Sequence, residues 1–72
     1  MNFSERLAFL QKSKEITKKT IMDATGISRT AYFRYENGAR VPDMSTLIAL
    51  ADFFGVSLDY LVGRTDNPEV NK

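Results

Sequence analysis

The sequence predicts a compact all-α domain of five short helices. Apolar residues recur at intervals of three and four along most of the chain, which is the spacing of one helix face. A polar capping residue precedes each of these stretches, and a glycine follows four of them, as helix ends require. No stretch shows the alternation typical of a strand. Seventy-two residues, 43% of them hydrophobic, suit one small domain.

The first predicted helix covers residues 3–12, and Asn2 followed three residues later by Glu5 resembles the capping box that begins many helices. Its apolar face consists of Phe3, Leu7 and Leu10. After a short polar loop, Thr17 is a suitable N-cap for a second helix, which ends at Gly26. The apolar residues expected to pack beneath this second helix are Ile16, Ile21 and Met22.

The third helix is predicted from Arg29 to Asn37, after a tight turn. Gly26 stands where the second helix should end in the left-handed conformation, which only glycine adopts cheaply. Ser28 can cap the third helix, and Ile27 should fill the turn from the core side. The inward residues are expected to be Tyr32 and Tyr35. One contiguous outer face contains Arg29, Thr30, Phe33, Arg34 and Asn37.

A fourth helix is predicted over residues 44–54, capped by Asp43 and ended by Gly55. A fifth, capped by Ser57, ends at Gly63. Their inward side chains are expected to be Leu47, Leu50, Ala51, Phe54, Leu58 and Leu61. Three others are expected at the surface near the C-terminus, where a dimer contact can form: Phe53, Tyr60 and Val62. We therefore expect a domain over residues 1–63, and over residues 64–72 a polar tail or the start of a linker.

The composition argues against several functional classes. The chain has no cysteine and no histidine, so disulfides, thiolate metal sites and the commonest general base are excluded. No apolar run approaches the ~20 residues of a membrane span, and no signal peptide is recognisable, so a cytoplasmic protein is expected. No phosphate-binding glycine loop or recognisable pair of carboxylates suggests an enzyme. We expect no cofactor, metal or small-molecule substrate.

Charge is divided unevenly along the chain. Residues 12–40 contain seven basic and three acidic side chains, a net charge of +4. Residues 41–72 contain two basic and five acidic ones, a net charge of −3. Such a division is typical of a protein with one face suited to a polyanion, although chance clustering on a solvated surface has the same appearance.

Two helices joined by a glycine turn form the unit that places its second helix in the DNA major groove. The run from Gly26 to Ser28, the Glu36-Asn37-Gly38 sequence, Pro42, and the ending LADFFGVSLDYL occur here in order. With this spacing, about residues 3–63 resemble the phage repressor and Cro type of helix-turn-helix domain, the Xre family. The resemblance implies a lambda-repressor-like five-helix fold, with its second and third helices reading DNA and a dimer bound to the operator.

Carried over position by position, the resemblance implies two sets of DNA contacts. The residues expected to contact bases are Arg29, Thr30, Phe33 and Arg34. The resemblance places Lys18, Asn37 and Arg40 at the DNA backbone, and we expect Lys19 and Ser28 to contact the backbone as well, Lys19 by neutralising phosphate. For each arginine the alternatives are a bidentate bond to guanine, a phosphate contact or a solvated side chain. Thr30 faces a base or is an ordinary first-turn residue. Phe33 either meets thymine methyl groups, rolls into the core beside Tyr32, or joins a protein contact.

Three positions depart from the family pattern. Met22 stands where a small alanine is preferred between the two helices, and the tyrosine hydroxyls of Tyr32 and Tyr35 require water or a partner. Glu36 matches a glutamate that in relatives often pairs with a basic residue of the first helix. This chain has Gln11 at the corresponding place, so the partner of Glu36 is left open.

These observations favour a sequence-specific transcriptional regulator that binds double-stranded DNA. The resemblance favours a repressor of phage, prophage or mobile-element type, bound as a homodimer to a pseudo-palindromic operator and associated with the nucleoid. The alternative is a protein-interaction module of antirepressor or antitoxin type. A partner protein, however, has no need of paired arginines beside clustered lysines.

Overall fold

The structure of the protein is a computed structural model and describes residues 1–69. In this part of the chain it contains five helices and no strand, which confirms the predicted fold class. The helices are α1 (Phe3–Ser13), α2 (Lys18–Thr25), α3 (Arg29–Glu36), α4 (Met44–Phe54) and α5 (Leu58–Leu61). None of them is long and apolar enough to cross a bilayer.

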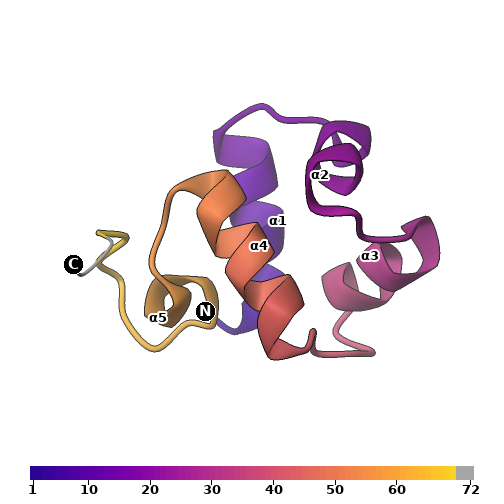
Figure 1. Ribbon diagram of the computed structural model, residues 1–72. Helices are drawn as coiled ribbons and strands as arrows, with labels where there is room; N and C mark the ends of the chain where they lie inside the picture. Colours follow the sequence, from indigo (N-terminus) through magenta and orange to yellow (C-terminus); the bar gives the residue numbers. More distant parts are fainter. Residues whose placement is uncertain (70–72) are drawn as a thin grey trace.

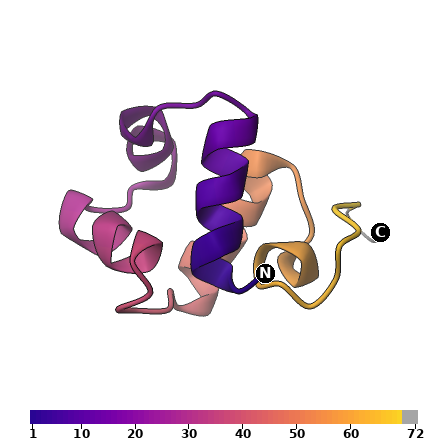
Figure 2. The ribbon, with the colours of Figure 1, turned by 180° about the vertical axis from the view of Figure 1, so that it is seen from behind.

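The helices are arranged around a central pair. In both ribbon views α1 and α4 occupy the middle of the molecule, with α2 and α3 on one side and α5 on the other (Figures 1 and 2). Helix α3 packs against α1, α2 packs against α4, and α5 contacts both central helices. The N-terminus and α5 therefore lie at the opposite end of the molecule from α2 and α3 (Figure 1).

Every predicted N-cap is confirmed, because each depends on a hydrogen bond within one helical turn. The five capping side chains each accept a hydrogen bond from a backbone N–H three residues on. They are Asn2, Thr17, Ser28, Asp43 and Ser57. Asn2 and Glu5 form the complete capping box, with bonds of 2.9 and 3.0 Å. At Asp43 the hydrogen bonds from Thr46 keep the carboxyl pKa below its usual value.

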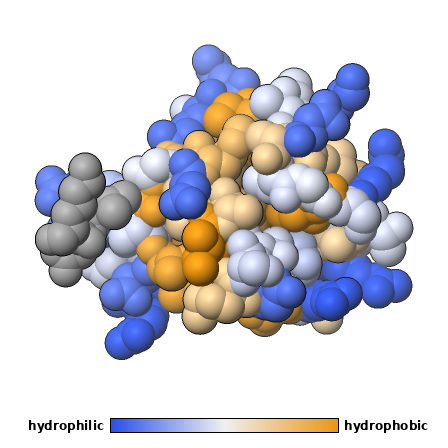
Figure 3. All heavy atoms as spheres, viewed as in Figure 1, coloured by the Kyte–Doolittle hydropathy of each residue, from blue (hydrophilic) through white to orange (hydrophobic). Residues whose placement is uncertain are grey.

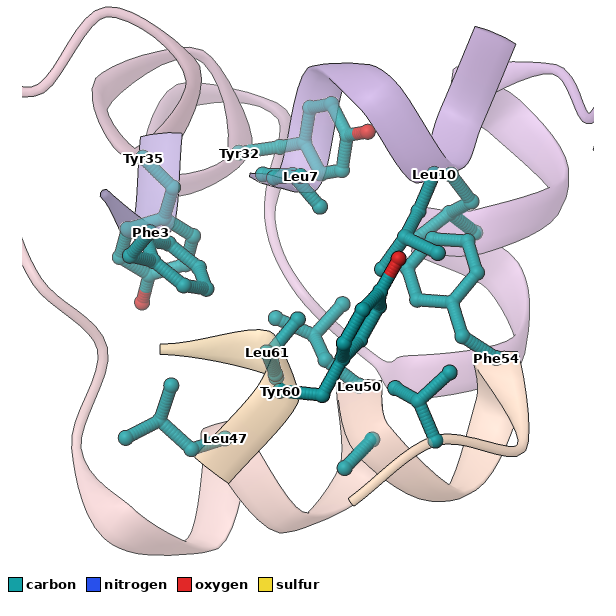
Figure 4. Close-up of a cluster of buried hydrophobic side chains, with 13 residues drawn as sticks. Phe3, Leu7, Leu10, Tyr32, Tyr35, Leu47, Leu50, Phe54, Tyr60 and Leu61 are labelled. Carbon is teal, nitrogen blue, oxygen red and sulfur yellow. The ribbon is translucent and has the colours of Figure 1, made fainter. Parts of the chain in front are cut away.

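The core joins all five helices. Leu7, Ile21, Leu50 and Leu61 come from four of them and are completely buried, and Tyr32 of α3 is buried with them. Figure 4 shows the side chains of α4 and α5 turned toward Phe3, Leu7 and Leu10 of α1. Met22 is half-buried and packs at the edge of this core.

The expected surface position of Tyr60 is wrong. Its side chain is only 8% exposed, and the Arg6 guanidinium lies over its ring at 3.8 Å from the centroid. Phe53 and Val62 are half-buried against the core and are not free surface groups. Tyr60 turns inward because the short helix α5 docks on α1, where Arg6 covers the ring with its planar cation.

The segment after α5 turns back onto the domain. Arg6 donates hydrogen bonds to the Thr65 carbonyl oxygen at 3.4 Å and to Asp66 Oδ1 at 3.3 Å. The Ser57 N–H donates to the Pro68 carbonyl oxygen at 3.0 Å. These contacts fasten residues 64–68 beside α1 and α5. Of the expected tail, residues 70–72 lie outside the described residues.

Candidate nucleic-acid interface

The turn between α2 and α3 has the predicted geometry. Gly26 ends α2 with φ of 76°, and its N–H donates to the Met22 carbonyl oxygen at 2.9 Å. Ser28 then begins α3, its Oγ accepting a hydrogen bond from the Ala31 N–H at 3.2 Å. Ile27, between them, packs half-buried against the core. This turn fixes both the direction and the rotation of α3.

The rotation of α3 separates its residues into a buried and an exposed face. Tyr32 and Tyr35 are 0% and 5% exposed and hold the helix to the core. All four residues expected to contact bases are exposed together on the other face: Arg29, Thr30, Phe33 and Arg34. The structure therefore brings the expected base-contact residues onto one solvent-facing surface.

The residues expected to contact the DNA backbone lie around this face. Lys19 is exposed at the start of α2, Ser28 is exposed at the start of α3, and Asn37 and Arg40 are exposed beyond the end of α3. Asn37 Oδ1 accepts a hydrogen bond from the Ala39 N–H at 3.0 Å, which shapes the loop leading to Arg40. In Figure 3 hydrophilic side chains project from the edge of the molecule where Figure 1 places α2 and α3.

Phe33 lies outside the core and contacts neighbouring side chains. Its side chain is 38% exposed, and its ring meets that of Tyr32 edge to face, with centroids 6.5 Å apart. Two cations lie near the ring: Lys18 Nζ is 5.0 Å and Arg29 Cζ is 5.4 Å from its centroid. Both distances are within the range of a cation–π interaction. The ring is thus a surface group held by charged neighbours.

Glu36 pairs with Lys18, a partner that the sequence did not identify. Lys18 Nζ lies 2.9 Å from Glu36 Oε1, and the pair joins the start of α2 to the end of α3. The Glu36 side chain is 17% exposed and that of Lys18 is 40% exposed. A cation at a helix N-terminus is unfavourable, and the carboxylate offsets this. In the sequence, the only indication of this pair is the position of Lys18 at a helix N-terminus, where its positive charge is unfavourable unless an anion lies nearby.

The arrangement suits recognition of a polyanion. The guanidinium groups of Arg29 and Arg34 have the planar donor geometry that matches guanine edges or phosphates. Lys19 and Arg40 add positive charge at the border of the same surface. Within residues 1–69 no group of three acidic, cysteine or histidine side chains gathers as a metal site would require.

Comparison with known proteins identifies this arrangement. Residues 9–61 match the helix-turn-helix family, so the match includes α2, the turn and α3. The chain belongs to the helix-turn-helix family. This confirms the resemblance to domains of phage repressor and Cro type.

Several regulators are similar to this helix-turn-helix protein. It is 44% identical over 68 residues to the uncharacterized HTH-type transcriptional regulator YqaE of Bacillus subtilis, covering 94% of this chain and 59% of the relative. It is 41% identical over 64 residues to the cryptic phage CTXphi transcriptional repressor RstR of Vibrio cholerae, covering 89% of this chain and 57% of that protein.

A crystal structure of a transcriptional regulator from Listeria innocua has the same fold. It superposes with a TM-score of 0.79 at 30% identity, covering 99% of this chain and 62% of the other. The helix-turn-helix protein thus spans about 60% of the length of these relatives.

Proposed function

We propose that this helix-turn-helix protein is a sequence-specific DNA-binding transcriptional regulator that inserts α3 into the major groove. The observation that carries the proposal is the division of α3. Tyr32 and Tyr35 anchor one face in the core, while the four expected base-contact residues occupy the other. A helix fixed by one face and exposing arginines on the other has the form in which such helices enter the groove.

The proposed base contacts come from Arg29, Thr30, Phe33 and Arg34. Arg29 lies at the first position of α3, the end of a recognition helix that usually points into the groove, so it is the better candidate for a bidentate bond to guanine. The proposed backbone contacts come from Lys18, Lys19, Ser28, Asn37 and Arg40. Lys18 meets phosphate while it is paired with Glu36, because an ammonium group has three donors.

A repressor of phage, prophage or mobile-element type is the form of regulator we favour. Among the relatives, RstR is named a cryptic phage repressor, and YonR of Bacillus subtilis, 40% identical over 63 residues, is named SPbeta prophage-derived. We propose that the protein binds a pseudo-palindromic operator as a homodimer, with half-sites about 34–36 Å apart, and blocks a promoter. It would act in the cytoplasm at the nucleoid, without enzymatic activity.

Fluorescence anisotropy on two duplexes tests the proposal. One duplex carries an operator obtained by selection from random DNA, and the other carries the same bases in scrambled order. We expect binding to the operator at least ~10³-fold tighter than to the scrambled duplex at physiological salt. Equal and steeply salt-dependent binding to both would refute sequence-specific recognition. No binding at low salt would instead favour the protein-interaction alternative.

A further inference from the structure

Four side chains from α2 and α3 form one connected group at the proposed DNA surface, which we call the Phe33 cluster: Lys18, Arg29, Phe33 and Glu36. The ion pair Lys18–Glu36 is 2.9 Å long, and the Phe33 ring centroid lies 5.0 Å from Lys18 Nζ and 5.4 Å from Arg29 Cζ. The Tyr32 ring contacts it from the core side at an interplanar angle of 86°. The cluster leaves Phe33 38% exposed.

Glu36 is the unexpected member of this cluster. A carboxylate beside a surface that binds phosphates opposes binding, and removing it from water to 17% exposure has a further cost. Its pairing with Lys18 cancels the charge of both, so the pair adds nothing to the net positive charge of the surface. The pair instead fixes where the Lys18 ammonium lies, and that ammonium lies beside the Phe33 ring.

We propose that Glu36 is a positioning residue, which holds Lys18 against Phe33 so that the ring presents a fixed apolar contact to the 5-methyl group of a thymine. This inference rests on the proposed function. It assigns to Glu36 and Lys18 a role in base discrimination that acts through Phe33, in addition to the proposed contact of Lys18 with phosphate.

Thymine is the base that this arrangement selects. Its methyl group is the one apolar feature among the base edges in the major groove, and a phenyl ring provides no hydrogen bond for the other edges. Lys18 and Arg29 lie within cation–π distance of the ring and Tyr32 meets it edge to face, and these contacts limit its movement. Burial of one methyl group contributes about 0.8 kcal/mol, which corresponds to about four-fold in affinity.

The test replaces thymines by deoxyuridine, one position of each half-site at a time, in the selected operator. This change removes only the 5-methyl group, so the ratio of affinities for the two duplexes cancels general electrostatic effects. Anisotropy titrations compare the wild type with Glu36→Gln, Lys18→Met and Phe33→Ala. Asp52→Asn on α4 is the matched control, because Asp52 is exposed and the change adds the same charge as Glu36→Gln. Thermal unfolding verifies that each variant is folded.

We expect one thymine position at which deoxyuridine weakens wild-type binding about four-fold. Phe33→Ala should abolish this difference, Glu36→Gln and Lys18→Met should reduce it to less than about two-fold, and Asp52→Asn should retain it. A folded Glu36→Gln variant with the full four-fold difference would overturn the inference. So would a wild type that prefers its operator but is indifferent to deoxyuridine at every position, and the proposed function would then survive. Equal binding to operator and scrambled DNA would refute both.

Discussion

The Tyr32 hydroxyl is a buried polar group without a partner, and its removal should stabilise the protein. Tyr32 is 0% exposed and lies beside Leu7 in the core (Figure 4). Its hydroxyl oxygen makes no hydrogen bond to any of the described residues. A buried, unsatisfied hydroxyl costs about 1–3 kcal/mol of stability. Of the two expected alternatives for this hydroxyl, water or a partner, the described residues provide no partner.

The substitution Tyr32→Phe removes the hydroxyl and keeps the ring. Because the packing of the ring is retained, we expect the free energy of unfolding to rise by about 1 kcal/mol at pH 7. In a domain of this size such a gain raises the Tm by about 4–8 °C. Urea denaturation followed by circular dichroism measures the free energy, and a thermal scan measures the Tm.

Alkaline pH provides a second measurement on the same substitution. Burial, and secondarily the negative charge of Glu36, raise the pKa of Tyr32 from 10.0 to about 12. Below pH 10 the phenol is neutral in both folded and unfolded chains. As the pH rises from 10 to 12 the unfolded chain ionises first, so wild-type stability falls by about 1.4 kcal/mol per pH unit from this group. Tyr32→Phe should lack this contribution.

Two results would refute this reasoning. A Tyr32→Phe variant less stable than the wild type at pH 7 would mean that the hydroxyl makes a favourable bond, for example to a buried water. Identical loss of stability between pH 10 and 12 in both proteins would mean that Tyr32 ionises equally in the folded and unfolded chains. Tyr35→Phe is a suitable control for the general effect of removing a tyrosine hydroxyl from α3.

Four further substitutions test other parts of the structure. Glu15 has a φ of 53°, in the left-handed region that glycine adopts without strain. Glu15→Gly should therefore raise the free energy of unfolding, measured by urea denaturation, by about 1 kcal/mol. A lower free energy of unfolding in this variant would show that the backbone at Glu15 is not strained. In the same assay Arg6→Ala should lower the free energy of unfolding by about 2–4 kcal/mol, because Arg6 is 4% exposed and covers Tyr60. Asp66→Asn should lower it by less than about 1 kcal/mol, because the Asp66 side chain is 99% exposed. Equal losses in the two variants would show that the ion pair, and not the packing of Arg6 on Tyr60, accounts for the stabilisation. Arg29→Ala should weaken operator binding by about 1–3 kcal/mol in anisotropy titrations and relax preference at one base pair, and equal weakening on scrambled DNA would indicate a phosphate contact instead.

Local features of the fold were predictable because they depend on a few neighbouring residues. Capping hydrogen bonds span three residues, so all five N-caps follow from residue type and spacing. The burial of Tyr32 and Tyr35 follows from their spacing of three and from the turn at Gly26. The same reasoning places Arg29 and Phe33 on the exposed face, although their contacts with DNA stay a prediction.

Contacts between distant residues were not predictable in the same way. Arg6 is charged, so its pattern indicates a surface residue, and only the docking of α5 on α1 shows that its cation covers Tyr60. Helix α5 has a single turn, and so short an element provides too few residues for periodicity to identify its inward side. The partner of Glu36 depends on the angle between α2 and α3, which the sequence does not specify.

Helix α3 reverses the ordinary preference of its aromatic residues. Stability alone favours the phenyl ring inside and the hydroxyl outside, yet Tyr32 buries an unpaired hydroxyl while the adjacent Phe33 remains 38% exposed. The exposed ring is held by Lys18 and Arg29, and Lys18 is in turn held by Glu36. Lys18, Arg29 and Glu36 therefore together hold an apolar ring at the surface. Exposing this ring becomes favourable if another apolar group covers it when the protein binds DNA. A thymine methyl group in the major groove has the size and the polarity to do so.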